Sequence, residues 1–239
     1  MKKIITILLT LHASLFTLHP AEAQIIHIPA DYSSIQAGIV VANPGDTILV
    51  SDGLYYENID FLGKKPLMVA SHFLIDGDTN HINSTIINGS QPNDPNWGSV
   101  VIMQNGEDST SVLCGFTITG GTGTFVAPAD NSTFGGGVYI SNGGKITNNH
   151  IEYNMVTCSS QAAGGGVWMG GGPGAISLHC VLRSNRIAHN TVLSYNYQGL
   201  GGGLACALDL ILEDNEFIFN EASVSLRGYG GCVNISGWW

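Results

Sequence analysis

The sequence predicts an all-β fold in which the chain winds as a parallel β-helix, a solenoid whose successive coils stack strand on strand. Three observations support this prediction. Triplets of glycine recur through the C-terminal half, a motif with two asparagines lies between them, and 44% of the 239 residues are hydrophobic whereas 11% are charged. Units of about thirty residues, made of short strands and glycine or asparagine turns, are typical of a solenoid with strands roughly 4.8 Å apart.

Composition excludes several other classes of protein. So few charged residues are not typical of a disordered polyampholyte or of a coiled coil. The 32 glycines follow no three-residue period, which excludes a collagen helix. The formal net charge is −10, so we expect no broad basic surface and no nucleic-acid partner.

Residues 1–23 are predicted to be a signal peptide. Two lysines precede an apolar run from Ile4 to Leu18, and Ala21-Glu22-Ala23 has the small-x-small form of a cleavage site. Residues 24–239 then form a single parallel β-helix domain. No later run is long and apolar enough to span a bilayer, so we expect no membrane span after cleavage and a secreted, cell-surface or periplasmic location.

In chain order, the N-terminal part begins with a strand and a short amphipathic helix. The helix is expected over residues 31–42, with Ser33 and Gln36 as a capping-box pair and Asn43-Pro44 ending it. Such a helix covers the open end of a winding core. Strands outside the repeat are expected at Ile25–Ile28, Thr47–Val50, Tyr55–Ile59, Leu67–Ala70, Thr85–Ile87 and Val100–Met103.

The glycine triplets define the repeat of the C-terminal half. They begin at positions 135, 164 and 201, and a fourth copy, Gly230-Gly231-Cys232, follows. The longer middle unit is explained by an insertion near Gly170 to Cys180, so the register is kept. Each copy opens a short strand whose first and third residues are expected to face inward: Val138–Ile140, Val167–Met169, Leu204–Cys206 and Val233–Ile235.

Six asparagines are predicted to form structural ladders. The motif apolar-x-x-Asn-x-apolar-x-x-Asn occurs three times between the triplets, which places its asparagines at equivalent corners of successive coils. Their amides are expected to hydrogen-bond along the stack and to tolerate the left-handed backbone of a tight bend. We favour this structural role over a catalytic one for Asn149, Asn154, Asn185, Asn190, Asn215 and Asn220.

Two aromatic residues form a candidate glycan-binding pair. Tyr139 and Trp168 fall in the same outward column of successive triplet strands, so their rings are expected one rung apart. Exposed stacked aromatics make a platform for the faces of sugars. The alternative is an aromatic ladder that only stabilises the sheet, which the interruption of the column by Ala205 and Asn234 favours.

Three N-terminal stretches carry a family resemblance: IPADYSSIQ at 28–36, NPGDTI at 43–48 and GLYYE at 53–57. They resemble the start of pectin-lyase-like right-handed β-helix proteins. Farther on, GGGVYI with IEYN and its two later copies are similar to the repeats of polymorphic outer-membrane proteins. The resemblance implies a right-handed, single-stranded parallel β-helix with an N-terminal capping helix. That architecture carries lyases, hydrolases, esterases, adhesins and inert shafts.

The enzyme branches of that architecture have catalytic motifs that this sequence lacks. The WxDH and RxPxxR motifs of pectate lyases are missing, as are the GHG and RIK motifs of polygalacturonase-like hydrolases. Arg186 shares an outward column with His150 and Glu216, where a rung-to-rung ion pair with Glu216 explains it. Asp76-Gly77-Asp78 is expected to be a plain turn. No catalytic residue, metal site or cofactor is therefore assigned, and calcium is expected only if the protein is a lyase.

The five cysteines are expected to be buried thiols. Their number is odd and no CxxC pair occurs, so neither a complete disulfide set nor a zinc site is predicted. They are Cys114, Cys158, Cys180, Cys206 and Cys232.

Three functions fit these observations. The first is an exported surface or extracellular β-helix module for adhesion or glycan binding, whose partner is a polysaccharide or cell-surface glycan. The second is a polysaccharide lyase or related glycan-active enzyme, and the third is a structural shaft. Because the last triplet strand is followed only by Ser236 and Gly237-Trp238-Trp239, we expect the domain to be truncated at its C-terminal end. In the third function, the shaft projects the missing domain.

Overall fold

The structure is a computed structural model that describes residues 22–126, 131–170, 180–207, 209–224, 227–229 and 231–235. The signal peptide expected over residues 1–23 lies outside the described residues, apart from its last two. The residues after position 235 and most of the insertion expected near Gly170 to Cys180 also lie outside them. None of the helices in the described ranges is long and apolar enough to cross a membrane.

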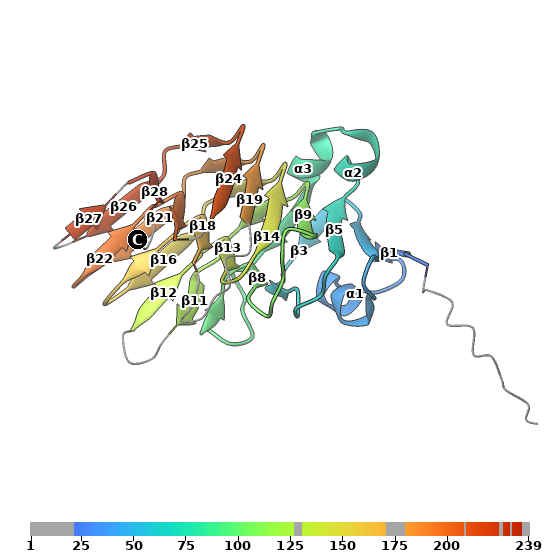
Figure 1. Ribbon diagram of the computed structural model, residues 1–239, viewed down its shortest axis with the longest axis horizontal. Coiled ribbons are helices and arrows are strands. Elements are labelled where there is room, and N and C mark those ends of the chain that lie inside the picture. The colour runs from blue at the N-terminus through green and yellow to red at the C-terminus, as the bar shows by residue number, and fades with distance from the viewer. Residues whose placement is uncertain are drawn as a thin grey trace, which may run out of the picture.

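The described chain winds as a β-solenoid. Its coils follow one another along the long axis of the molecule, from the N-terminal strands at one end to the C-terminal strands at the other (Figure 1). Successive coils add one strand to each of several sheets, and almost all of these strands pair in parallel. The expectation of an all-β chain with long parallel sheets is therefore confirmed.

Three sheets form the walls of the stack. Sheet A contains β1 (Ile25–Ile28), β2 (Thr47–Val50), β5 (Leu67–Ser71), β9 (Ser111–Cys114), β14 (Gly144–Thr147), β19 (Cys180–Arg183) and β24 (Leu210–Glu213). Sheet B contains β3 (Gly53–Tyr55), β6 (Thr85–Asn88), β10 (Thr117–Thr119), β15 (His150–Glu152), β20 (Arg186–Ala188) and β25 (Glu216–Ile218). Sheet C contains β4 (Ile59–Asp60), β8 (Val101–Met103), β13 (Val138–Ile140), β18 (Val167–Met169), β23 (Leu204–Cys206) and β28 (Val233–Ile235).

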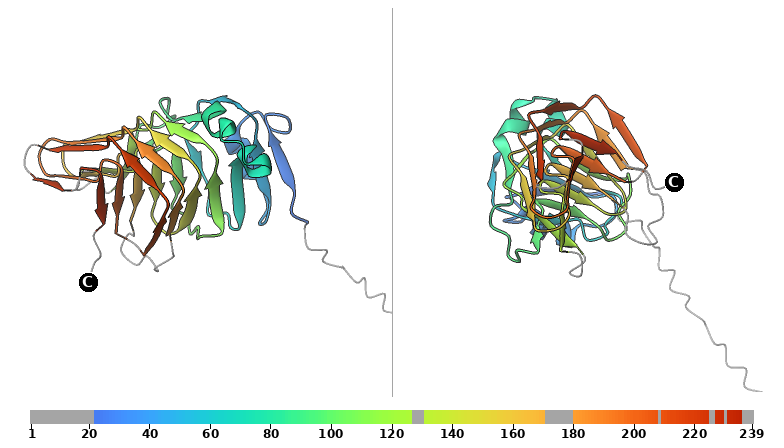
Figure 2. Two further views of the ribbon diagram at one scale, coloured as in Figure 1. Left: turned by 90° about the horizontal axis from the view of Figure 1, so that it is seen from above. Right: turned by 90° about the vertical axis from the view of Figure 1, so that its left-hand side faces the viewer.

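Two further sheets form a side extension of the later coils, seen projecting from the stack in Figure 2. Sheet D contains β7 (Trp97–Gly98), β11 (Gly123–Val126), β12 (Ser132–Phe134), β17 (Ala162–Ala163), β22 (Gln198–Leu200) and β27 (Arg227–Tyr229), and β11 pairs antiparallel with both of its neighbours. Sheet E contains β16 (Met155–Cys158), β21 (Thr191–Ser194) and β26 (Glu221–Val224). A later coil thus runs from sheet B outward through sheet E, returns through sheet D and re-enters the stack in sheet C.

The apolar core of the stack is continuous, and its columns follow the register expected from the triplets. Val138 pairs with Val167, which pairs with Leu204, and all three are fully buried. The side extension has a small core of its own, made by Val156, Cys158, Ala162 and Val192. No disulfide joins the five cysteines, and burial raises the pKa of Cys180 to about 12.

Helix α1 (Ile35–Val41) is shorter than the expected range of residues 31–42 and has a different N-cap. The Ser34 hydroxyl accepts a hydrogen bond from the backbone N–H of Ala37, so Ser34 rather than Ser33 caps the helix. Ile35 and Ile39 are fully buried, and the helix packs against β1, β2 and β4.

The structure contains two short helices that the sequence did not predict, and one predicted strand is divided into two. The helices α2 (Phe73–Asp76) and α3 (Asn80–Ser84) lie between β5 and β6, where the sequence shows no helical period because each helix is about one turn long. The strand expected over Tyr55–Ile59 is instead two strands, β3 and β4, because the chain turns a corner between sheets B and C.

The glycine triplets stand where the outgoing and returning strands of the side extension come closest. A Cβ atom added to Gly165 would lie 2.5 Å from the carbonyl oxygen of Gly202 and 2.7 Å from that of Thr191. A Cβ on Gly202 would lie 2.3 Å from the carbonyl oxygen of Glu221. These separations are too short for any side chain, so glycine is required at this neck by the close approach of backbone to backbone.

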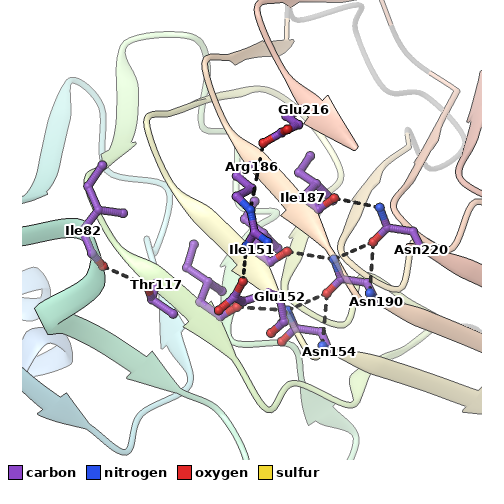
Figure 3. A network of polar contacts seen from close by, with 11 residues as sticks. Ile82, Thr117, Ile151, Glu152, Asn154, Arg186, Ile187, Asn190, Glu216 and Asn220 are labelled. Carbon is purple, nitrogen blue, oxygen red and sulfur yellow. Dashed lines mark hydrogen bonds and ion pairs between the residues drawn. The ribbon is translucent and has the colours of Figure 1, made fainter. Parts of the chain in front are cut away.

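The asparagines occupy two columns of hydrogen bonds along the stack. In the second column the Oδ1 atom of Asn190 accepts from the backbone N–H of Asn154 at 3.1 Å, and the Oδ1 of Asn220 accepts from that of Asn190 at 3.0 Å. The Nδ2 of Asn190 also donates to the carbonyl of Ile151 (Figure 3). The first column repeats the pattern through Asn149, Asn185 and Asn215.

The left-handed backbone lies one residue earlier than the sequence suggests. The residues with positive φ are those that precede each asparagine, not the asparagines themselves. The bend is needed because it turns the side chain of the following asparagine into the core. There the side-chain amide forms hydrogen bonds within its own coil and with the coils on either side. The bend residues are Asn148, Tyr153, Ser184, His189, Asp214 and Phe219, with φ between 49° and 56°.

We predict that Asn190→Ala lowers the free energy of unfolding by about 2–4 kcal/mol, because it leaves the N–H and the amide of Asn154 without their buried acceptor. Urea unfolding of the purified protein followed by circular dichroism measures this loss. Asn196→Ala, at an exposed turn position, is the matched control and is expected to change stability by less than about 0.5 kcal/mol. Equal stabilities of the two variants would contradict the prediction.

We also predict that Gly165→Ala destabilises the fold by about 3 kcal/mol or prevents folding, because its Cβ would overlap two carbonyl oxygens. The control is Gly231→Ala, since a Cβ there meets nothing within 4 Å among the described residues. Thermal unfolding compares the two, and a Gly165→Ala protein as stable as its control would show that the neck has room to adjust.

Candidate functional site

The aromatic pair expected to bind glycans has the expected register but not the expected exposure. Tyr139 pairs directly with Trp168 in sheet C. Tyr139 is only 6% exposed, however, and Trp168 is half-buried with its ring stacked on that of Phe134 at a centroid distance of 4.5 Å. Burial accordingly raises the pKa of the Tyr139 hydroxyl. The two rings therefore do not form an open platform, because the residues at the neck of the side extension pack against them.

Along the same outward column, toward the N-terminus, lies a groove that we call the Trp97 groove. Register places Asp60 beside Ile102 and Ile102 beside Tyr139. The groove has a volume of about 290 Å³, and the exposed indole of Trp97 forms one wall. It is lined by Asn58, Asp60, Asn93, Asp94, Trp97, Ile102 and Gln104.

A second hollow of about 260 Å³ continues the Trp97 groove. The two share Asn58 and Asn93, so they form one elongated surface. Tyr56, which is 52% exposed, gives this part an aromatic side chain as well. Its other lining residues are Ser34, Gln36, Glu57 and Gln91.

The base of the groove is fixed by hydrogen bonds between the first coils. The carboxylate of Glu57 accepts from the N–H groups of Ile35 and Gln36 at the start of α1, both at 2.9 Å. The Gln36 side chain in turn donates to the carbonyl of Asp60 and accepts from its N–H. The amide of Asn58 donates to two backbone carbonyls. The groove is thus preorganised before any ligand arrives.

Several polar side chains in the groove have no partner within the described residues. The side-chain amides of Gln91, Asn93 and Gln104 make no hydrogen bond there, and Asp94 uses one oxygen for the N–H of Asn96. Amides and carboxylates offer both the donors and the acceptors that sugar hydroxyls need. Among the described lining residues no lysine, arginine or histidine occurs, so the groove is neutral to acidic.

A second candidate lies on the outer face of sheet B beneath α2 and α3, in a groove of about 270 Å³. Arg186 stands between two carboxylates, 2.5 Å from Glu152 and 4.0 Å from Glu216 (Figure 3). The expected pair with Glu216 is therefore present, and a shorter one with Glu152 lies diagonally across the strands. Since both partners neutralise its guanidinium, Arg186 is not free to hold a ligand carboxylate.

The histidine of this second groove, His150, has a lowered pKa. Burial lowers the pKa of His150, and the positive charge of Arg186 lowers it further, against the opposing effects of Glu152 and Glu216. A neutral imidazole is a competent proton acceptor. Figure 3, which centres on the Arg186 contacts, shows Thr117 of the same outward column donating to the carbonyl of Ile82 in α3.

Asp76 ends α2 and Asp78 lies in the short connection to α3, so the plain turn expected at these residues is instead the junction of two short helices. Each carboxylate accepts a hydrogen bond from the backbone N–H two residues later, and Asp76 also contacts His81. In the described ranges, no group of three or more histidine, cysteine, aspartate or glutamate side chains is arranged to hold a metal ion.

Comparison with protein-family models, with curated proteins and with solved structures finds no match to this chain. The site is therefore defined by its own geometry. The Trp97 groove was missed in the sequence because its residues come from coils outside the repeat; the only available signal was an isolated tryptophan in the turn-rich segment that contains Pro92 and Pro95.

We predict that Arg186→Gln raises the pKa of His150, because the substitution removes a nearby positive charge and leaves the two carboxylates. An NMR titration of the imidazole Cε1–H signal measures the shift. Arg183→Gln is the matched control, since Arg183 pairs with Glu213 instead and does not act on His150. An unchanged or lower pKa in Arg186→Gln would show that burial alone sets the His150 charge.

Proposed function

We propose that the protein is an exported, extracellular or cell-surface β-helix module that binds a neutral glycan in the Trp97 groove and serves in adhesion. The observation that carries this proposal is the exposed Trp97 ring beside amide and carboxylate groups whose hydrogen-bonding capacity is not used within the described residues. An aromatic wall with convergent polar groups is the usual composition of a small-molecule site.

The charge of the groove favours neutral sugars over uronates. Glu57, Asp60 and Asp94 contribute negative charge, and the whole chain carries a formal net charge of −10. An anionic polysaccharide would be repelled unless a bound cation intervened. A role for Tyr139 and Trp168 in binding stays a prediction, with Trp168 the more accessible of the two.

We also propose that the solenoid is right-handed and single-stranded, belongs to the pectin-lyase-like architecture and is closed at its N-terminal end by α1. The resemblance of residues 28–36, 43–48 and 53–57 to that architecture supports this proposal, as does the strong general preference for right-handed crossovers between parallel strands. The burial of Ile35 and Ile39 against the first coil supports the capping role.

Two alternatives have separate signatures. A polysaccharide lyase would use the neutral His150 beside Arg186, and its product would be an unsaturated sugar formed with or without calcium. A structural shaft would bind no sugar and would only carry a further domain. The Trp97 groove favours glycan binding over a shaft, because a shaft does not explain an exposed tryptophan among amides with unused hydrogen-bonding capacity. The acidic lining of the groove favours a neutral glycan over the uronates that a lyase would take.

We predict that Trp97→Ala weakens binding to the preferred neutral polysaccharide by tenfold or more, since loss of the ring face removes about 1.4 kcal/mol or more of stacking energy. The secreted chain is tested against xylan, mannan, cellulose and β-1,3-glucan, with polygalacturonate and alginate as anionic comparisons. Binding is measured by pull-down and calorimetry, and unsaturated product by ultraviolet absorbance with and without calcium.

Tyr197→Ala is the matched control, because Tyr197 is an exposed aromatic residue that does not line the groove. It is expected to bind as the unaltered protein does. Binding that survives Trp97→Ala would reject the groove as the site. Unsaturated product from a uronate polymer would show that the protein is a lyase instead. Neither binding nor turnover of any polysaccharide in the panel would favour the structural shaft.

A further inference from the structure

Three aromatic side chains form an exposed column where the chain leaves sheet B for the side extension. The ring of Tyr153 stacks on that of His189 at a centroid distance of 5.0 Å and an interplanar angle of 2°. The ring of His189 stacks on that of Phe219 at 5.3 Å. Tyr153 is 62% exposed and Phe219 is 80% exposed, so the column lies on the surface rather than in a core.

The backbone at these positions does not favour aromatic residues. All three have φ near +50°, a left-handed conformation that suits glycine, asparagine and aspartate and strains larger side chains. The other bend of the same coils has the same φ but carries Asn148, Ser184 and Asp214, which are polar. Strained, exposed aromatics in three consecutive coils therefore point to a function outside the fold itself.

The column ends at Tyr153 on its N-terminal side. Continued by two residues, the register of the preceding coil places Gly120, which has no side chain to extend the column, beside Tyr153. Asn88 and Ser90 pack closely against Gly120, since a Cβ added there would lie 2.6 Å from the Oδ1 of Asn88 and 3.2 Å from the Cβ of Ser90. Ser90 is followed directly by Gln91, which lines the surface continuous with the Trp97 groove. The N-terminal end of the column thus lies next to the chain segment that leads into the groove defined above.

We propose that the aromatic column is a second contact surface for the same neutral glycan, which passes from the Trp97 groove over Ser90, stacks a sugar ring on the exposed ring of Tyr153 and continues past His189 and Phe219. This inference rests on the proposed function and adds to it that the ligand is a polysaccharide chain rather than a single sugar. The carboxylate of Glu152, next to the column, is already paired with Arg186, and the exposed rings of Tyr153 and Phe219 offer apolar surface to the carbon faces of sugars.

The test separates binding from stability. Tyr153→Asn and Phe219→Asn remove the rings but place a residue that suits the left-handed backbone. Ser184→Asn, at the equivalent bend on the other side of sheet B, is the matched control. Each variant is measured by calorimetry against the neutral polysaccharide of the panel that the unaltered protein binds and against a trisaccharide of the same sugar, and melting temperatures are recorded.

The expected result is that Tyr153→Asn weakens polysaccharide binding about tenfold and leaves trisaccharide binding unchanged, with an unchanged or higher melting temperature. The control keeps both affinities. Full polysaccharide affinity in Tyr153→Asn and Phe219→Asn, with loss in Trp97→Ala, would overturn this inference and leave the groove intact. A lower melting temperature would make the column a structural stack. If the unaltered protein binds no member of the panel, the proposed function fails and this inference fails with it.

Discussion

The approach of two backbones at the glycine triplets is the constraint on which the later coils depend. At the neck the outgoing and returning strands of the side extension leave no room for a Cβ atom. The triplets therefore fix where each coil re-enters sheet C, and with that the register of the inward columns. A side chain at the neck would separate the two strands and would also break the contact between the extension and the apolar core.

The asparagine columns provide hydrogen-bond partners for the backbone groups at the corners of the coils. At each corner the backbone turns, and some of its N–H and C=O groups lose their partners in the sheets. The side-chain amide of Asn149 accepts from the N–H of Phe116 in the preceding coil and donates to the carbonyls of Leu113 and Thr147, so a buried polar residue costs little. Because these bonds run between coils, an insertion outside the corners does not disturb the stack. The spacing between Asn149 and Asn185 exceeds that between Asn185 and Asn215, yet the hydrogen bonds have the same form.

The sequence predicts the parts of the structure that repeat from coil to coil better than the parts that occur once. The strands after the triplets and the corner asparagines were placed in advance because self-similarity reveals equivalent positions. The burial of Tyr139 was not foreseen, since Phe134 and the neck that cover this surface belong to a side extension that strand periodicity does not show. The left-handed bends were expected one residue late, because asparagine is itself a common left-handed residue. The Trp97 groove lies in coils without repeats, so only three-dimensional proximity brings its residues together.

Among the described residues, the side extension has a core of four buried residues, separate from the long core of the stack. Its strands are therefore held mainly by backbone hydrogen bonds and by a few small apolar side chains, which gives them a lower free energy of local opening than the walls of the solenoid. The stack of coils is therefore more stable to local opening than the side extension. Amide protons of sheets D and E can accordingly exchange with solvent while the coils of the stack stay paired. A change in the length of the extension is tolerated because it leaves the stack unchanged.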